Sequence, residues 1–127
     1  MNTATRLLMA AVILLAVDFL YLSFSSTFAK AMFERIQGSP MKFNYLAAAI
    51  VYLVLAYLLT RPYVDSATTA FGIGAATYAV YDFTNLATLK NYSVQFAIMD
   101  TLWGGTLFAL AHFIYSTLVA RLEGGSA

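Results

Sequence analysis

Residues Leu7–Phe28 read LLMAAVILLAVDFLYLSFSSTF, an unbroken apolar run with one charged side chain, Asp18. A helix rises about 1.5 Å per residue, so roughly 20 apolar residues cross a ~30 Å hydrocarbon core. This run therefore predicts a membrane-spanning helix. Three more apolar stretches follow, at Tyr45–Thr60, Ala67–Leu89 and Val94–Val119. Because all of these runs are continuous and not alternating, they favour helices over the strands of a membrane barrel.

The four stretches predict an all-α membrane protein, a bundle of four transmembrane helices that forms one domain over residues 1–127. The second stretch is short for a span, and Lys42 and Arg61 can extend from its ends to the interface. An even number of spans places both termini on the same side of the membrane. The seven basic residues divide almost evenly between the two sides, so the positive-inside rule leaves the orientation open.

The amino-acid composition also indicates a lipid environment. The chain is 61% hydrophobic and 10% charged, and its mean hydropathy is +0.76, whereas soluble domains carry about 25% charged residues. A net charge of +1 argues against a nucleic-acid partner, and the absence of cysteine excludes disulfides and thiol chemistry. We therefore expect an integral membrane protein whose main partner is the lipid bilayer.

One other interpretation of the first stretch is a secretory signal. Arg6, the apolar run and Ala29-Lys30-Ala31 together resemble such a signal with its small-residue cleavage site. However, Asp18 interrupts the apolar core, and the run is longer than the hydrophobic region of an ordinary signal. The first stretch is therefore kept as a membrane span.

Charged residues inside apolar stretches are the strongest functional indication, because burying a charge in a membrane costs a few kcal/mol or more. Three aspartates lie in the first, third and fourth stretches. Counted from one membrane face, these aspartates and Tyr52 lie within about 6 Å of one depth. We therefore predict one buried polar cluster. Its members are Asp18, Asp82, Asp100, Asn85, Tyr52, Tyr78 and Trp103.

The predicted cluster has no lysine or arginine at its depth. A buried carboxylate without a nearby cation must either take up a proton or accept several hydrogen bonds. We therefore expect at least one of the three aspartates to carry a proton at neutral pH. Such a cluster suits the binding or relay of a proton, a cation or a polar lipid headgroup. The aspartates can equally serve as hydrogen-bonding contacts between helices, without chemistry.

Two further functions remain open. Asp82 and Asp100 lie on neighbouring helices, where a carboxyl pair could act as general acid and base in a lipid-modifying or hydrolytic membrane enzyme. The Gly-x-Gly-Asp motif of intramembrane aspartyl proteases is missing before Asp100, so catalytic residues stay unassigned and an enzyme is not favoured. The pairs Gly72/Gly74 and Gly104/Gly105 also suit an interaction subunit, either in a homo-oligomer or in a larger membrane complex.

The only histidine, His112, lies about 18 Å from Asp100 along the same helix and therefore outside the cluster. Together with Tyr115 it predicts a secondary polar spot. A single histidine and no cysteine exclude multi-histidine iron sites and bis-histidine haem. We therefore expect neither a metal nor a cofactor.

The run Tyr81-Asp82-Phe83-Thr84-Asn85-Leu86, followed by Asp100-Thr101-Leu102-Trp103-Gly104, resembles a family of small bacterial membrane proteins known as domain of unknown function 2177. The resemblance covers nearly the whole chain. It implies a four-helix, multi-pass protein of the bacterial inner membrane, in which Asp82 and Asp100 belong to the shared pattern. It implies no activity.

Overall fold

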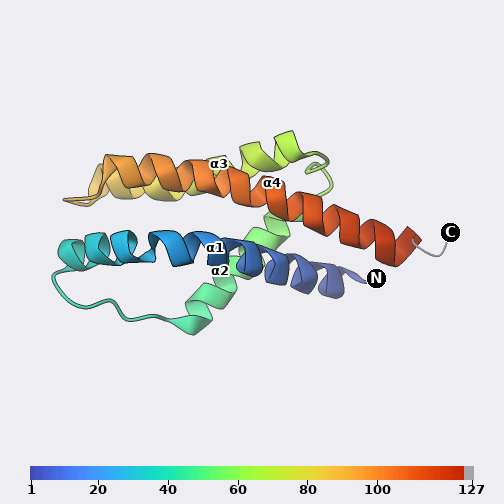
Figure 1. The fold of residues 1–127 in the computed structure, drawn as a ribbon, viewed down its shortest axis with the longest axis horizontal. Helices are drawn as coiled ribbons and strands as arrows, with labels where there is room; N and C mark the ends of the chain where they lie inside the picture. Colours follow the sequence, from blue (N-terminus) through green and yellow to red (C-terminus); the bar gives the residue numbers. More distant parts are fainter. Residues whose placement is uncertain (125–127) are drawn as a thin grey trace.

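The computed structural model describes residues 1–124, which form four helices. These are α1 (Thr3–Gln37), α2 (Tyr45–Leu59), α3 (Ala67–Thr88) and α4 (Val94–Gly124). The most extensive packing is between α3 and α4, and α1 packs against both α2 and α4. In Figure 1, α2 crosses the other helices obliquely, and the N-terminus and the end of α4 lie at the same end of the molecule.

Each of the four predicted stretches coincides with a helix, which confirms the all-helical prediction. Thr60 and Leu89, predicted as the last residues of two spans, are the C-caps of α2 and α3. Within residues 1–124, α1 and α4 are the two helices that are long and apolar enough to cross a membrane, and α2 is apolar but shorter. The structure thus contains two candidate spans among its four helices.

Polar side chains before three of the helices explain where these helices begin. The side chains of Asn2, Asn44 and Ser66 accept hydrogen bonds from the first-turn amides of α1, α2 and α3, at 2.8, 3.0 and 3.2 Å. Such caps pair amide groups that have no partner inside the helix. Helix α1 ends where Gly38 adopts the left-handed conformation, with φ +71°, and donates its amide to the carbonyl of Glu34.

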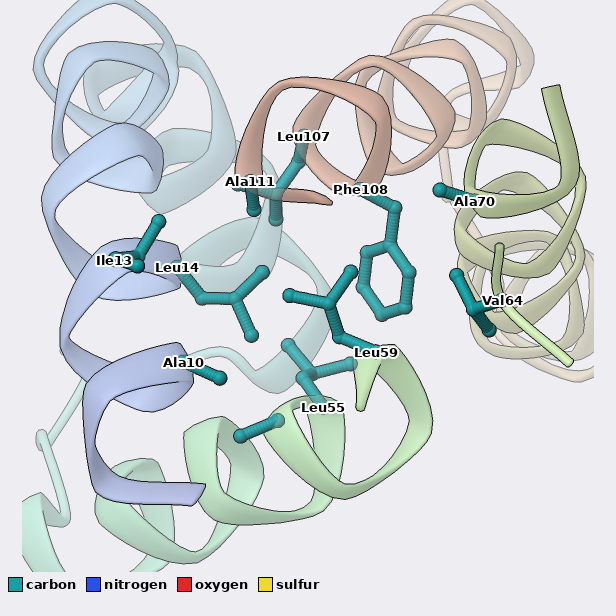
Figure 2. Packing of buried hydrophobic residues seen from close by; sticks show 11 residues of the cluster. Ala10, Ile13, Leu14, Leu55, Leu59, Val64, Ala70, Leu107, Phe108 and Ala111 are labelled. Atoms are coloured by element: carbon teal, nitrogen blue, oxygen red, sulfur yellow. The ribbon is translucent and has the colours of Figure 1, made fainter. Parts of the chain in front are cut away.

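Two apolar clusters hold the helices together. The larger cluster lies toward the end of the molecule that carries the termini, and Figure 2 shows Leu14, Leu59 and Phe108 meeting there from α1, α2 and α4. The smaller cluster lies where the end of α1 meets the start of α4, and it includes Met32 and Phe96. On each of α1, α3 and α4, the aspartate lies between residues of the larger cluster and residues of the smaller cluster.

Glycines bring α3 and α4 into close contact. A methyl group on Gly74 would lie 2.2 Å from the carbonyl oxygen of Gly104, and one on Gly104 would lie 2.3 Å from Cγ of Tyr78. Gly105 packs in the same way against the ring of Phe71. Atoms of the same chain therefore pack directly against these three glycines. Gly72, in contrast, is exposed and has no such neighbour.

Candidate functional site

The carboxyl group of Asp18 joins three helices. It is buried in α1 with 6% of its surface exposed. One oxygen accepts a hydrogen bond from the hydroxyl of Tyr52 on α2, and the other accepts one from the indole Nε1 of Trp103 on α4, at 2.8 Å. Hydrogen bonds to a carboxylate are stronger than those between neutral groups. Asp18 is therefore a point of attachment between α1 and its two neighbours.

Asp100 on α4 is linked to α1 through Tyr21. The Tyr21 hydroxyl donates to Oδ1 of Asp100 at 3.0 Å. The ring of Tyr21 also stacks on Trp103, with the ring centroids 4.9 Å apart and the planes 8° from parallel. Because Trp103 itself bonds to Asp18, the environments of Asp18 and Asp100 are connected through two stacked aromatic rings.

Asp82 on α3 is the most deeply buried of the three aspartates, with no exposed surface. Its Oδ1 accepts a hydrogen bond of 2.7 Å from the Tyr92 hydroxyl. Burial raises the pKa of Tyr92, which lies in the connection between α3 and α4, so this hydroxyl keeps its proton and acts as the donor. Within residues 1–124, Oδ2 of Asp82 is buried and has no hydrogen-bond partner. Asp100, on the neighbouring helix α4, is close enough for its charge to act on Asp82.

No basic side chain balances this cluster in the described part of the chain. The ion pairs found among residues 1–124 both involve Glu123, far along α4. Nor do these residues contain a group of three or more histidine, aspartate or glutamate side chains placed to hold a metal ion. The hydrogen bonds to these carboxyl groups come from tyrosine and tryptophan side chains, and Oδ2 of Asp82 is a buried oxygen without a partner in residues 1–124.

The other two predicted members lie at different places in the cluster. The ring of Tyr78 packs on Gly104, and its hydroxyl lies near the carboxyl groups of α1 and α4. Asn85, one turn beyond Asp82 on α3, lies near the hydroxyl of Tyr92. Tyr78 is thus at the centre of the cluster, and Asn85 is at its edge.

Sequence reasoning missed the role of Tyr92 and the true partner of Tyr21. Tyr92 belongs to a polar loop, but Asn91 before it adopts a left-handed conformation with φ 70°, and Tyr92 lies back against α3. Asparagine in a short loop is a typical sign of such a turn. Tyr21 shares a helical face with Asp18, which suggests Asp18 as its partner, yet it bonds to Asp100.

An apolar cavity lies beside the cluster, between α1 and α4. Its volume is about 250 Å³, and it is lined by Phe24, Ser25, Phe28, Gln95, Phe96 and Met99. Ser25 is buried and donates to the carbonyl of Tyr21 at 2.8 Å. None of the three aspartates lines this cavity, and Asp100 is connected to it only as the residue that follows Met99 in the chain.

The secondary polar spot at His112 and Tyr115 lies apart from the aspartates. The Nε2 atom of His112 is 3.1 Å from the carbonyl oxygen of Val64. His112 and Tyr115 both line a second cavity, together with Arg6 and Arg61. The charged side chains that line this second cavity are therefore basic, whereas the cluster in the middle of the molecule is acidic.

Tyr92→Phe tests how much the hydroxyl of Tyr92 contributes. This change leaves the buried Asp82 without its tyrosine donor, so we expect the unfolding free energy to fall by about 1–3 kcal/mol. Reversible unfolding in mixed micelles, followed by circular dichroism, measures the difference. Tyr45→Phe is the matched control, because Tyr45 is 79% exposed. Equal stability of the two variants would contradict a structural role for this hydrogen bond.

Comparison with known proteins places the chain in a membrane protein family. Residues 3–117 match the model of the family described as predicted membrane protein, domain of unknown function 2177. The chain belongs to this family, which confirms the resemblance seen in its sequence. No curated protein and no solved structure matches the chain.

Proposed function

We propose that this family member is a multi-pass protein of the bacterial inner membrane, whose four helices all cross the bilayer with both termini on the same side. Each helix carries a large, exposed apolar side chain: Leu20, Leu46, Val80 and Phe113 are 70%, 73%, 70% and 68% exposed. Such surfaces are costly in water but favourable against acyl chains. The 15 residues of α2 rise only about 22 Å, so aromatic residues at its ends and local thinning of the bilayer complete the crossing.

Within this membrane protein, we infer that the carboxyl pair Asp82 and Asp100 binds a proton. The observation that supports this is Oδ2 of Asp82, which is buried without a hydrogen-bond partner in residues 1–124, on a helix that packs against the one that carries Asp100. Two carboxylates held together in a site of low polarity cannot both stay charged at low cost, and a shared proton relieves their repulsion. Tyrosine and tryptophan donors hold both oxygens of Asp18, and Oδ1 of Asp82 and of Asp100, in place.

Neighbouring hydroxyl groups give the bound proton a route of exchange. Tyr21 and Tyr92 donate to Asp100 and Asp82, respectively. A tyrosine hydroxyl can donate one hydrogen bond and accept another, so it can pass a proton on when its partner changes charge. The pair can therefore relay its proton as well as bind it, with Asp18 as the third acidic group of the cluster.

The single tryptophan of the chain provides a direct test of proton binding. Trp103 bonds to Asp18 and stacks on Tyr21, so its fluorescence responds to the charge of the cluster. We expect the emission of wild-type protein in lipid nanodiscs to change in one acid titration. Asp82→Asn and Asp100→Asn should remove or shift this transition. Asp65→Asn is the control, because Asp65 is exposed in the connection between α2 and α3.

The outcomes of this titration separate binding, relay and a cation site. An unchanged transition in both Asp82→Asn and Asp100→Asn would contradict proton binding by the pair. A change of Trp103 emission on adding sodium at constant pH would reassign the site to a cation. Proton flux through proteoliposomes, lost in Asp82→Asn but kept in Asp65→Asn, would establish relay in addition to binding.

The cavity between α1 and α4 favours a second candidate function, in which the carboxyl pair meets a polar lipid headgroup. The cavity is apolar, is lined on α4 by Met99, the residue before Asp100, and is large enough for part of a lipid. The pair would then act as general acid and base on that lipid, or simply bind its headgroup. Lipid analysis of a deletion strain, complemented with wild type or Asp100→Asn, tests this function. A stable partner that co-purifies with both forms would instead favour an interaction subunit.

A further inference from the structure

The second cavity, about 430 Å³ in volume, combines positive charge with apolar surface. It is formed by the first turns of α1, the end of α2, the connection to α3 and the second half of α4. Arg6 and Arg61 line it from two different elements, and His112 lies on the α4 wall. Leu59 and Val119 provide apolar lining. We call this space the basic cavity.

Arg6 has a hydrogen-bond donor to spare in the basic cavity. Its Nη2 donates to both carboxylate oxygens of Glu123, and this ion pair lowers the pKa of Glu123. The Arg6 side chain is 41% exposed, and its Nε has no hydrogen-bond partner among residues 1–124. A guanidinium group carries five N–H donors, and Glu123 occupies only one of the three nitrogens. The unused N–H donors of Arg6 are therefore free to bind an acceptor from outside the chain.

Arg61 is held in place without its charge being balanced. Its Nε donates to the carbonyl of Tyr57 at 2.8 Å, and its guanidinium carbon lies 4.0 Å from the centroid of the Tyr57 ring. These contacts already restrict the conformations of the Arg61 side chain. Less conformational entropy is therefore lost when the side chain binds a ligand. In the described part of the chain, Arg61 has no ion pair with an acidic side chain.

We propose that the basic cavity binds the phosphate group of an anionic phospholipid, held between Arg6 and Arg61. Guanidinium groups match the geometry of phosphate oxygens, and basic pockets between helices are typical sites for lipid headgroups. If the helices span the bilayer, helix ends such as those of α1 and α2 lie at headgroup depth. The hydroxyl group of Tyr115, which also lines the cavity, adds a donor for glycerol or phosphate oxygens.

The mixed lining favours a lipid over free phosphate. Inorganic phosphate would use the two arginines but gain nothing from Leu59 and Val119. A phospholipid presents its phosphate to the arginines while its glycerol and first methylene groups contact these apolar side chains. The two sources of phosphate therefore differ in the contacts they can make, and a binding experiment can separate them.

Native mass spectrometry of the detergent-purified protein tests this proposal. We expect the wild type to bind phosphatidylglycerol more tightly than phosphatidylcholine. Arg61→Gln should weaken phosphatidylglycerol binding about tenfold, because it removes a charge-assisted contact. Arg121→Gln is the matched control: Arg121 is also basic and near the C-terminus, but it does not line the cavity. A thermal melt of each variant verifies that it is folded.

Three results would overturn the proposal. The first is equal binding of the two lipids by the wild type, and the second is unchanged phosphatidylglycerol binding by Arg61→Gln. The third is binding of inorganic phosphate as tight as that of phosphatidylglycerol, which would assign the cavity to free phosphate. Arg61→Gln should keep the acid transition of Trp103, because Arg61 lines the basic cavity and lies outside the acidic cluster. The lipid proposal is therefore tested independently of proton binding.

Discussion

Gly74→Ala is expected to lower the unfolding free energy by about 3 kcal/mol, at the upper end of what overpacking costs. The added methyl group would lie 2.2 Å from the carbonyl oxygen of Gly104 and 2.6 Å from Cβ of Phe108. The first of these atoms belongs to the backbone, so it cannot turn aside, and α4 must move away from α3. Reversible unfolding in mixed micelles measures the loss. The acid transition of Trp103 should also change, because Asp82 and Asp100 sit on the two helices that separate.

Gly72→Ala is the control for this prediction. Gly72 lies two residues earlier on the same helix, and a methyl group there would meet no atom within 4 Å. Alanine is also favoured over glycine in a helix by up to about 1 kcal/mol, so Gly72→Ala should be neutral or slightly stabilising. If the two variants had the same stability, close approach at Gly74 would not be what holds α3 to α4.

The sequence predicted the helices well but not where α1 ends. The apolar run stops at Phe28, and Glu34 and Arg35 follow it, so the predicted span ends at Phe28. The structure continues α1 to Gln37 and ends it at Gly38. Charged residues end the apolar run but not the helix. They are compatible with a helical backbone, and the helix can extend beyond the membrane. Gly38, with Pro40 two residues later, is the stop signal here.

For the candidate site, the level of each side chain along its helix could be predicted from the sequence. Which donor bonds to which carboxyl group could not. Counting residues along each helix gives the level of a side chain, because the rise per residue is fixed. Which donor meets which carboxyl group depends on how the helices rotate and cross, and this is set by packing. Trp103 is three residues from Asp100, yet it donates to Asp18 on another helix. Tyr21 shows the converse, since it lies near Asp18 in sequence and bonds to Asp100.

Trp103→Ala is expected to produce the other large effect, a loss of about 3–5 kcal/mol in unfolding free energy. The change removes the donor to Asp18 and the ring that stacks on Tyr21. Both contacts join α1 to α4, so α1 should detach more easily while α3 and α4 stay paired. Because the variant has no tryptophan, circular dichroism must follow its unfolding. Hydrogen exchange should show faster amide exchange in α1 than in α4.

Two further variants separate the contributions of the indole group. Trp103→Phe keeps an aromatic ring for Tyr21 but loses the N–H donor to Asp18, so it should cost about 1–3 kcal/mol. Phe113→Ala removes an aromatic ring from the same helix at a position that is 68% exposed, and it should cost little. If Trp103→Ala were as stable as Phe113→Ala, α1 would be held by the apolar cluster around Leu14 alone. The three carboxyl groups would then owe their convergence to apolar packing, and Asp18 could titrate independently of α4.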